Sequence, residues 1–448
     1  MITSPSKEFH LKTNETHKGL GEFFSEYERQ KKAAPFVVNK IPFNELDKWK
    51  FVSDEYLGDE YLGHDSGKFF RIEGLKVRTN FGQRAYPHEW LQPIINQPEI
   101  GILGIITKVF NERRYYLMQL KAEPGNVNIL QLSPTVQATK SNFSQVHEGK
   151  PTLFLEYFTD IAKSRILIDQ LQSEQGGRFL RKRNRNMIVE ITEVLEIPEN
   201  FFWLTLTEIK HLLTIDNFVN MDARSVISTI PLETSFAFPI CSDDTIIRWY
   251  IDQKVKYELE VEKISLKDLQ LDGWGKSTHR FFKNDRHFSI IAIKVEAGNR
   301  EVSSWTQPMI TDANVGLVGF IVKNFNKVPH YLVQAKVMPG NIDIIDMSPT
   351  VSVSNFNYSA FMSKEKPAFI EYFSNKLHKV KKVIYSALQS EEGGRFYHLE
   401  NLNSIVELDE DEKLDIPDNY IWITRDQINK FMPYGMFNIE ARSLISTL

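Results

Sequence analysis

Polar and basic residues occur in this sequence as pairs at corresponding places along the chain. Arginines and the backbone amides of a helix end bind pyrophosphate, amide and hydroxyl side chains bind sugar hydroxyls, and aromatic rings stack on a base or a sugar face. Together these residue types would suit a nucleotide-activated sugar. The pairs are Gln92 and Gln307, Gln119-x-Lys121 and Gln334-x-Lys336, "KSNFS" (140–144) and "FNYS" (356–359), Arg178 and Arg395, and Arg224 and Arg442.

Each pair also has a purely structural interpretation. Gln119-x-Lys121 fits the solvated face of a strand, and Arg178 and Arg395 could satisfy the last carbonyls of a helix. The Ser-Asn-Phe and Asn-Tyr-Ser stretches could be turns held by their own side chains. Residues that fit a core better than a stacking platform are Trp49, Trp90, Trp274 and Trp305.

The common catalytic signatures are missing from the chain. It has no GxxxxGK[ST], no GxGxxG after a strand, no HExxH and no GxSxG. The 11 histidines show no metal-ligand spacing, and the single cysteine, Cys241, excludes an intramolecular disulfide and a cysteine-rich metal site. We therefore expect no metal.

Composition is that of an ordinary globular protein. The 448 residues are too many for one core and suit two domains. Lys and Arg number 54 against 58 Asp and Glu, so the net charge of −4 provides no basic field for nucleic acid or an anionic membrane. There is no apolar run of membrane-spanning length and no apolar run of a signal peptide near the start. We expect a soluble, cytoplasmic protein.

One long unit is written twice in the sequence. The order of the repeated phrases is kept with almost no insertions, so we interpret the repeat as the duplication of a whole domain. The predicted divisions are an arm over 1–40, a first unit over 41–232, a connector over 233–262 and a second unit over 263–448. The repeated phrases are "YLMQLKAEPGN" (116–126) and "YLVQAKVMPGN" (331–341), "LSPTV" (132–136) and "MSPTV" (347–351), "QSEQGGRF" (172–179) and "QSEEGGRF" (389–396), and "NMDARSVIST" (220–229) and "NIEARSLIST" (438–447).

Within each unit the residue patterns predict an α+β fold. The β-rich runs 315–325 and 330–337 predict a hairpin, and "NIDIIDMS" and "PAFIEYF" predict further strands. The spacing of Leu377, Val380, Ile384 and Leu388 predicts a helix that ends at the Gly393–Gly394 pair. Thr205 with Glu208, and Thr424 with Gln427, predict capping boxes of a later helix in each unit.

Long blocks of the sequence resemble the nucleoside-diphosphate-hexose 2,3-dehydratase family of deoxysugar biosynthesis. The resemblance covers nearly the whole chain, including the duplication, and the second copy fits it more loosely. It implies a cytoplasmic homodimer whose two repeats each have a Nudix-like α+β fold. The blocks that carry it are "WLQPIINQPEIGILGIITKVF" (90–110), "LMQLKAEPGNVNILQLSPTVQATKSNFSQVHEGK" (117–150), "LQSEQGGRFLRKRNRNMIVE" (171–190) and "WLTLTEIKHLL…NFVNMDARSVIS" (203–228).

A Nudix hydrolase activity does not follow from this resemblance. That motif ends R-E-U-x-E-E-x-G, and "ALQSEEGG" (387–394) keeps only its EE-x-G tail. Ala387 and Leu388 stand at the Arg and Glu positions, and the first copy has Gln170 and Leu171 there. Mg²⁺-dependent hydrolysis needs those carboxylates, so we do not expect it.

The chemistry that the resemblance implies needs no cofactor. The substrate would be a dTDP-4-keto-6-deoxyhexose, whose C4 ketone acidifies the C3 hydrogen. A base near C3, hydrogen-bond donors on the C4 oxygen and an acid at the C2 hydroxyl would remove water. The resulting enol would settle as a 3,4-diketo-2,6-dideoxy sugar and pass to a 3-ketoreductase.

The resemblance also carries substrate-contacting residues onto this chain. As catalytic acid or base we nominate His147, Tyr358 and Lys336. Phe143 stands where members of the family often have tyrosine, whereas Tyr358 keeps the hydroxyl in the second copy. The residues carried over are Trp49, Lys140, Ser141, Asn142, Phe143 and Ser144 in the first copy and Trp305, Asn357, Tyr358 and Ser359 in the second, with Arg178, Arg224, Arg395 and Arg442 as phosphate-binding or structural candidates.

Two other functions stay open at this stage. One is a catalytically silent protein that binds a sugar nucleotide, which the Phe143 departure favours. The other is a different lyase or isomerase that acts on another keto sugar. Neither the working copy nor the nucleotide base follows from the sequence.

Overall fold

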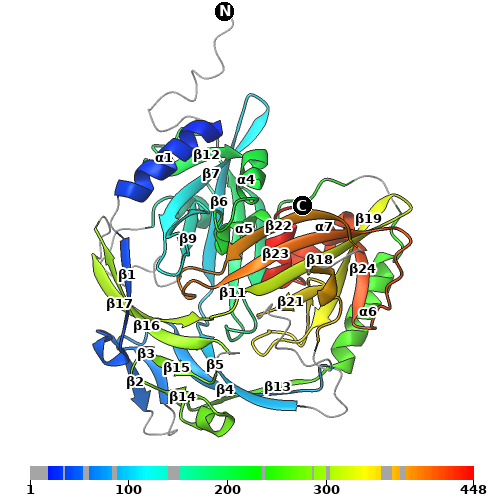
Figure 1. The fold of residues 1–448 in the computed structure, drawn as a ribbon. Coiled ribbons are helices and arrows are strands. Elements are labelled where there is room, and N and C mark those ends of the chain that lie inside the picture. Colours follow the sequence, from blue (N-terminus) through cyan, green and yellow to red (C-terminus); the bar gives the residue numbers. More distant parts are fainter. Residues whose placement is uncertain are drawn as a thin grey trace, which may run out of the picture.

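The computed structural model describes residues 19–33, 36–53, 60–82, 88–139, 152–234, 238–284, 287–298, 303–354, 366–373 and 380–448. It is a mixed α/β structure, mostly sheet with few helices, and it has two similar sheet-rich halves (Figure 1). We call the part of the chain from α1 to α5 (19–227) the first half and the part from α6 to α8 (243–445) the second half, each with the strands between those helices. No helix in the described ranges is long and apolar enough to cross a membrane.

Each half is built on a seven-stranded sheet. In both sheets one pair of central strands is parallel (β11 with β6, β23 with β18) and the other neighbours are antiparallel. The first sheet has the order β10 (Arg165–Ser173), β11 (Arg183–Glu190), β6 (Gly101–Phe110), β7 (Arg113–Ala122) and β12 (Phe201–Thr205), with β8 (Leu130–Ser133) beside β7 and β9 (Val136–Ala138) beside β6. The second has β22 (Val380–Ser390), β23 (Glu400–Leu408), β18 (Gly316–Phe325), β19 (Val328–Lys336) and β24 (Tyr420–Thr424), with β20 (Asp346–Ser348) and β21 (Val351–Val353) at the corresponding places.

Two smaller sheets exchange a strand between the halves. β1 (Phe36–Ile41) of the first half pairs with β16 of the second, and β13 (Leu259–Ile264) of the second pairs with β4 of the first. This reciprocal exchange makes the two halves one interlocked body (Figure 1). The other strands are β2 (Trp49–Ser53), β3 (Glu60–His64), β4 (Arg71–Thr79) and β5 (His88–Asn96) in one sheet, and β14 (Gly275–Lys276), β15 (Arg280–Phe282), β16 (Ser289–Ala297) and β17 (Ser304–Thr311) in the other.

The helices cover corresponding parts of the two halves. α1 (Gly19–Ala33) packs on the first core, where Tyr27 donates to the Leu130 carbonyl, and α6 (Asp243–Lys256) packs on the second, where Tyr250 donates to the Ile345 carbonyl. The predicted boundaries leave both helices outside the two units, although both contribute to the cores. The remaining helices are α3 (Glu156–Thr159), α4 (Leu206–Leu212), α5 (Met221–Ile227), α7 (Arg425–Phe431) and α8 (Ile439–Ile445), and the 3-10 turns are η1 (Phe43–Glu45), η2 (Asp268–Asp272), η4 (Ile370–Phe373) and η5 (Met432–Tyr434).

Several local predictions are confirmed. The hairpin of β18 and β19 forms, and the two residues of its turn, Asn326 and Lys327, both have positive φ. Both capping boxes are present: Thr205 with Glu208 opens α4, and Thr424 with Gln427 opens α7.

The prediction of a helix that ends at Gly393–Gly394 is wrong, because residues 380–390 form strand β22. The pairing of β22 with β23 shifts register twice, between Val380 and Lys382 and between Val383 and Tyr385. Such bulges break the two-residue alternation of a strand and leave apolar residues at helix-like spacing. The Gly pair is therefore not a helix stop in either copy, since β10 occupies the same place in the first half.

"PAFIEYF" is not a strand as predicted, since its end forms the 3-10 turn η4. Only the last part of "NIDIIDMS" is extended, as β20. The stretch predicted to be a connector contains α6 and β13, so most of it is regular structure.

Candidate active site

Each repeated Gly-Gly-Arg-Phe turn lies against the Pro-Gly-Asn turn of the other half. Gly125 N donates to Gly393 O at 2.8 Å, and Gly340 N donates to Gly176 O at 2.6 Å. A Cβ on Gly125 would lie 1.7 Å from Phe396 O, and one on Gly340 would lie 1.7 Å from Phe179 O. Only glycine fits such a close backbone approach, so the repeated phrase marks the joint between the halves.

Arg224 and Arg442 hold this joint from inside the molecule. Arg224 donates to Gln389 Oε1 at 2.6 Å and to Ser390 O at 2.5 Å, across to the second half. Arg442 donates to Ser173 O at 2.5 Å in the first half. Their exposed fractions are 1% and 0%. The sequence leaves two roles open for these arginines, phosphate binding and a structural role. These contacts favour the structural role.

The exchange creates two polar clusters, each built from both halves. We call the first cluster Lys121, Glu123, Gln137, Asn220 and Asp222 of the first half together with Glu392 and Arg395 of the second half. Its counterpart, the second cluster, is Lys336, Met338, Ser352, Asn438 and Glu440 of the second half together with Gln175 and Arg178 of the first.

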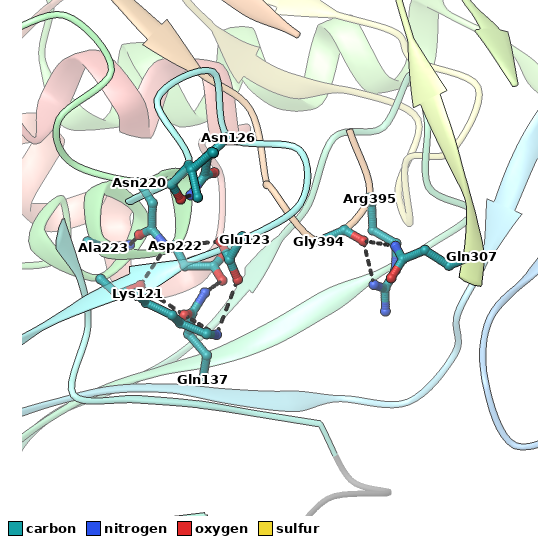
Figure 2. Close-up of polar contacts among 12 residues, drawn as sticks. Lys121, Glu123, Asn126, Gln137, Asn220, Asp222, Ala223, Gln307, Gly394 and Arg395 are labelled. Atoms are coloured by element: carbon teal, nitrogen blue, oxygen red, sulfur yellow. Dashed lines mark hydrogen bonds and ion pairs between the residues drawn. The ribbon is translucent and has the colours of Figure 1, made fainter. Parts of the chain in front are cut away.

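Hydrogen bonds connect the first-half members of the first cluster. Lys121 Nζ donates to Gln137 Oε1 at 2.5 Å and lies 3.2 Å from Glu123 Oε1. The Gln137 amide in turn donates to Asp222 Oδ2. In Figure 2 these four side chains point toward one another from β7, β9 and the start of α5. A cation, two carboxyl groups and an amide are thus gathered at one place.

The local order of the chain explains why Asp222 lies there. Asn220 is the N-cap of α5, and its side chain accepts from Ala223 N at 2.9 Å. The same amide donates to Ser133 Oγ at 2.8 Å and to Glu123 Oε2 at 3.5 Å. The cap therefore fixes the first turn of the helix, with Asp222 in it, against the end of β8.

Asp222 and Glu392 of the first cluster, and Glu174 beside it, have raised pKa values. Burial, followed by the charges of Glu392, Glu123 and Glu174, raises the pKa of Asp222 well above its usual value. Burial and Glu123 likewise raise the pKa of Glu392, against the lowering effect of Arg395. Burial and Glu392 raise the pKa of Glu174 to about 7. Burial and the charges of neighbouring carboxyl groups therefore both favour the protonated form of Asp222 and of Glu392.

Arg395 brings further second-half groups to the first cluster. Its guanidinium donates to Gln97 Oε1 of the first half at 3.2 and 3.1 Å and lies 4.3 Å from the centre of the Phe70 ring. The Gly394 carbonyl accepts from both Arg395 and Gln307 at 2.9 Å (Figure 2). Trp305 donates to Gln307 Oε1 at 2.9 Å. Trp305, predicted for the second copy's site, is therefore tied to the cluster of the first half.

The second cluster repeats the geometry with different side chains. Lys336 Nζ donates to Ser352 O at 2.5 Å, and Gln175 Nε2 donates to Glu391 Oε2 at 2.6 Å. Burial lowers the pKa of Lys336 and raises that of Glu391 to about 7. Arg178 lies 3.9 Å from the centre of the Phe288 ring and 4.0 Å from Asp312 Oδ2.

The two clusters differ in their acids. Where the first has Glu123 and Glu392, the second has Met338 and Gln175, whereas Asp222 is matched by Glu440. The first cluster therefore has three carboxyl groups of its own where the second has one. Both arginines of the repeated phrase bond a carbonyl of their own turn (Gly177 and Gly394), but no helix ends there, so the helix-end interpretation is wrong.

The structure locates only part of the predicted site. Trp49 is 7% exposed and packs on Phe70 at 4.6 Å between ring centres, within a hydrophobic core. Lys336 lies in the second cluster, and its first-half equivalent, Lys121, lies among the acids. Predicted residues that fall outside the described residues are Lys140, Ser141, Asn142, Phe143, Ser144, His147, Asn357, Tyr358 and Ser359.

Sequence reasoning missed the carboxyl groups Glu123, Asp222 and Glu392, and the amide of Gln137. It weighed what the two copies share, whereas the useful signal lies where the copies differ. A comparison by letter would have shown Glu123 against Met338 and Glu392 against Gln175 inside otherwise matching phrases. Within the described ranges, no group of three or more His, Cys, Asp or Glu side chains could hold a metal ion.

Comparison with known proteins gives consistent matches over the chain. A family model described as NDP-hexose 2,3-dehydratase matches residues 20–230 and 243–448. Three curated relatives carry the name dTDP-4-dehydro-6-deoxy-alpha-D-glucopyranose 2,3-dehydratase. Those of Amycolatopsis orientalis and Saccharopolyspora spinosa are 39% and 40% identical over 92% of this chain and 86% and 88% of their own. That of Streptomyces violaceoruber is 36% identical over 92% of this chain and 93% of its own.

Proposed function

The chain belongs to the NDP-hexose 2,3-dehydratase family, and on this basis we propose that it removes water from a dTDP-4-keto-6-deoxyhexose. The product is a dTDP-3,4-diketo-2,6-dideoxyhexose. The enzyme is then a carbon–oxygen lyase. The observation that carries a site for this reaction is the first cluster, where Lys121 pairs with the carboxyl group of Glu123 and the Gln137 amide links Lys121 to the carboxyl group of Asp222.

These side chains can divide the elimination among them. Glu123, paired with Lys121, takes the C3 proton, and the electrons of that bond move toward the C4 oxygen, where the Lys121 ammonium stabilises the enolate. The electrons then return to re-form the C4 carbonyl while a C2–C3 double bond forms and the C2–O bond breaks. Asp222 gives its proton to the departing hydroxyl, which leaves as water. The 3-hydroxy enol loses its hydroxyl proton and gains one at C2 to become the 3-ketone.

Groups around the first cluster are suited to the rest of the substrate. Arg395 presents a cation beside Phe70, and Trp305 with Gln307 adds an aromatic ring and an amide. Such groups bind diphosphate, base and sugar. Residues 140–144 follow β9, whose Gln137 belongs to the cluster, and this supports their proposed contact with the sugar nucleotide. The corresponding proposal for the second half is that the sugar nucleotide is contacted by Asn357, Tyr358, Ser359 and Arg178. His147 and Tyr358 remain proposed proton carriers.

The finer features that the family resemblance implies are proposals as well. We propose that each half has a Nudix-like fold, which its mixed sheet and covering helices support. We also propose a cytoplasmic homodimer, to be tested by sedimentation equilibrium and by fractionation of the producing cell. The diketo product would be consumed by a 3-ketoreductase.

The test of the function is direct. The protein is incubated with dTDP-4-keto-6-deoxyglucose, a 3-ketoreductase and its nicotinamide cofactor, and the sugar nucleotides are analysed by mass spectrometry. We expect a 2-deoxy product that is lighter by the oxygen lost from C2. Binding of dTDP without any 2-deoxy product would make the protein a silent binder, and exchange of the C3 hydrogen alone would make it an isomerase.

A further inference from the structure

The side-chain amide of Gln137 lies between Lys121 and Asp222 and makes three hydrogen bonds. Its Oε1 accepts from Lys121 Nζ at 2.5 Å and from Ser133 Oγ at 3.0 Å, and its Nε2 donates to Asp222 Oδ2 (Figure 2). Within the described ranges, this N–H is the hydrogen-bond partner of the Asp222 carboxyl group. One amide therefore contacts a cation with its oxygen and an acid with its nitrogen.

The neighbours of Gln137 fix which way its amide points. An ammonium group has donors and no acceptor, so Lys121 must face the amide oxygen. On the other side, Asn220 Oδ1 accepts from Ala223 N at 2.9 Å, which leaves its Nδ2 to donate to Ser133 Oγ at 2.8 Å. The Ser133 hydroxyl can then direct its own proton to the amide oxygen. A flipped amide would set an NH2 group against the ammonium, so the N–H must face the carboxyl group.

This orientation decides which oxygen of Asp222 can carry a transferable proton. Oδ2 accepts the N–H of Gln137, and an N–H donor on one carboxyl oxygen favours the form that has its proton on the other oxygen. The protonated acid therefore has its O–H at Oδ1. After the proton has left, the same N–H stabilises the negative charge on Oδ2, because a hydrogen bond to an ionised acceptor is stronger than one to a neutral acceptor.

The second cluster has no such amide. Ser352 stands at the place of Gln137, in "VSV" (351–353) against "VQA" (136–138). Lys336 Nζ donates to the backbone carbonyl of Ser352 at 2.5 Å instead of to a side chain. The lysine is thus held in both halves, but only the first half links it to an acid.

The polar groups around Ser352 show what the missing amide leaves behind. In the part of the chain that the structure describes, three buried atoms of the second cluster and its surroundings have no hydrogen-bond partner: Ser348 Oγ, Asn438 Nδ2 and Glu440 Oε2. Their first-half equivalents form the chain from Asn220 through Ser133 and Gln137 to Asp222. The amide is therefore the member that completes this chain.

We propose that Gln137 is a positioning residue of the elimination: held by Lys121, its amide keeps the transferable proton of Asp222 on Oδ1 and stabilises the carboxylate that remains. This inference deepens the proposed function and rests on it. In the acid step the Oδ1–H bond and the C2–O bond of the sugar break. The proton joins the departing hydroxyl to form water, and the electron pair of the O–H bond stays on the carboxylate.

The experiment measures two rates in one sample in D₂O. Exchange of the C3 hydrogen in recovered substrate needs the base, whereas formation of the 2-deoxy product needs the acid as well. Q137E still offers an oxygen to Lys121 and Ser133, but it presents an oxygen instead of an N–H to Asp222 Oδ2, which draws the proton away from Oδ1. We expect product formation to fall about 10²-fold and exchange to stay within about threefold of the wild type.

A second variant removes the amide without adding a charge. In Q137M the acid loses its N–H donor, while Glu123 still lies beside Lys121, 3.2 Å away in the wild type. The ratio of C3 exchange to product formation should therefore rise about tenfold or more in Q137M as well as in Q137E. Because both rates come from the same sample, this ratio does not depend on the folded fraction, whereas a merely structural role would lower both rates together.

The matched control is S352E, which places the same carboxyl group at the equivalent position of the second half. Its rates should stay within about twofold of the wild-type values once the folded fraction is known from thermal unfolding. An unchanged ratio in Q137E or in Q137M, or an equal rise of the ratio in S352E, would overturn the inference. A wild-type protein that forms no 2-deoxy product would instead refute the proposed function, so the two failures are distinguishable.

Discussion

The two polar clusters share a backbone and differ in their acids. In both, a lysine on the central hairpin, an N-capping asparagine and a Gly-Gly-Arg-Phe turn from the opposite half occupy equivalent places. Only the first also has Glu123 and Glu392. Duplication thus kept the architecture in both places and the proposed proton-transfer groups in one, which supports the proposal that the elimination takes place at the first cluster.

The largest effect should come from the base. E123Q keeps the hydrogen-bonding shape beside Lys121 but cannot take a proton, so we expect kcat to fall about 10³-fold, since positioned acid–base groups contribute about 10²–10⁴-fold. The measurement is the rate of C3 proton exchange and of 2-deoxy product formation. M338Q, the same new side chain at the equivalent position, should leave both rates near the wild-type values. Equal losses in the two variants would remove the distinction between the clusters.

The next effect concerns the close backbone contact that each half makes with the other, at Gly125 and at Gly340. Alanine at Gly125 or at Gly340 puts a Cβ 1.7 Å from a carbonyl oxygen of the opposite half, so each joint must open. We expect each variant to lose about 3 kcal/mol of unfolding free energy, the upper part of the range for overpacking. Denaturant unfolding measures both. If only one of them were destabilised, the two joints would not be equivalent.

The smallest effect concerns pH. Burial raises the pKa of Glu174 and of Glu391 to about 7 in the fold, above the usual value of 4.5. Each group then adds stability that is fully present below about pH 4.5 and is lost as the pH rises through 7. The unfolding free energy should therefore fall between pH 5 and pH 8, and E174Q and E391Q should each reduce that fall, by about 2.5 kcal/mol at most. A fall that neither variant changes would mean that other groups titrate.

Much of the fold follows from local sequence signals, and the joint does not. The hairpin at Asn326 and Lys327 and the capping boxes at Thr205 and Thr424 depend on neighbouring residues, which the sequence places side by side. The sequence of the bulged strand β22 predicts a helix instead, because its two register shifts remove the alternation that identifies a strand.

The site was harder to predict because its members come from both copies. The turn that carries Glu392 lies against Gly125, and Trp305 is linked to that turn through Gln307, only because the halves exchange turns. Reading each copy by itself places Trp305 with the second copy and hides the contact of Gly393 with Gly125. The differences between two equivalent phrases, rather than their likeness, indicate the chemistry.

The most direct test of this assignment compares the two equivalent acids, Asp222 and Glu440. D222N and E440Q are incubated with dTDP-4-keto-6-deoxyglucose and the reductase trap, and the 2-deoxy product is measured over time. The account predicts about a 10³-fold loss for D222N and a rate within about twofold of the wild type for E440Q. A D222N enzyme that still forms the product at the wild-type rate, or an E440Q enzyme that does not form it, would contradict it.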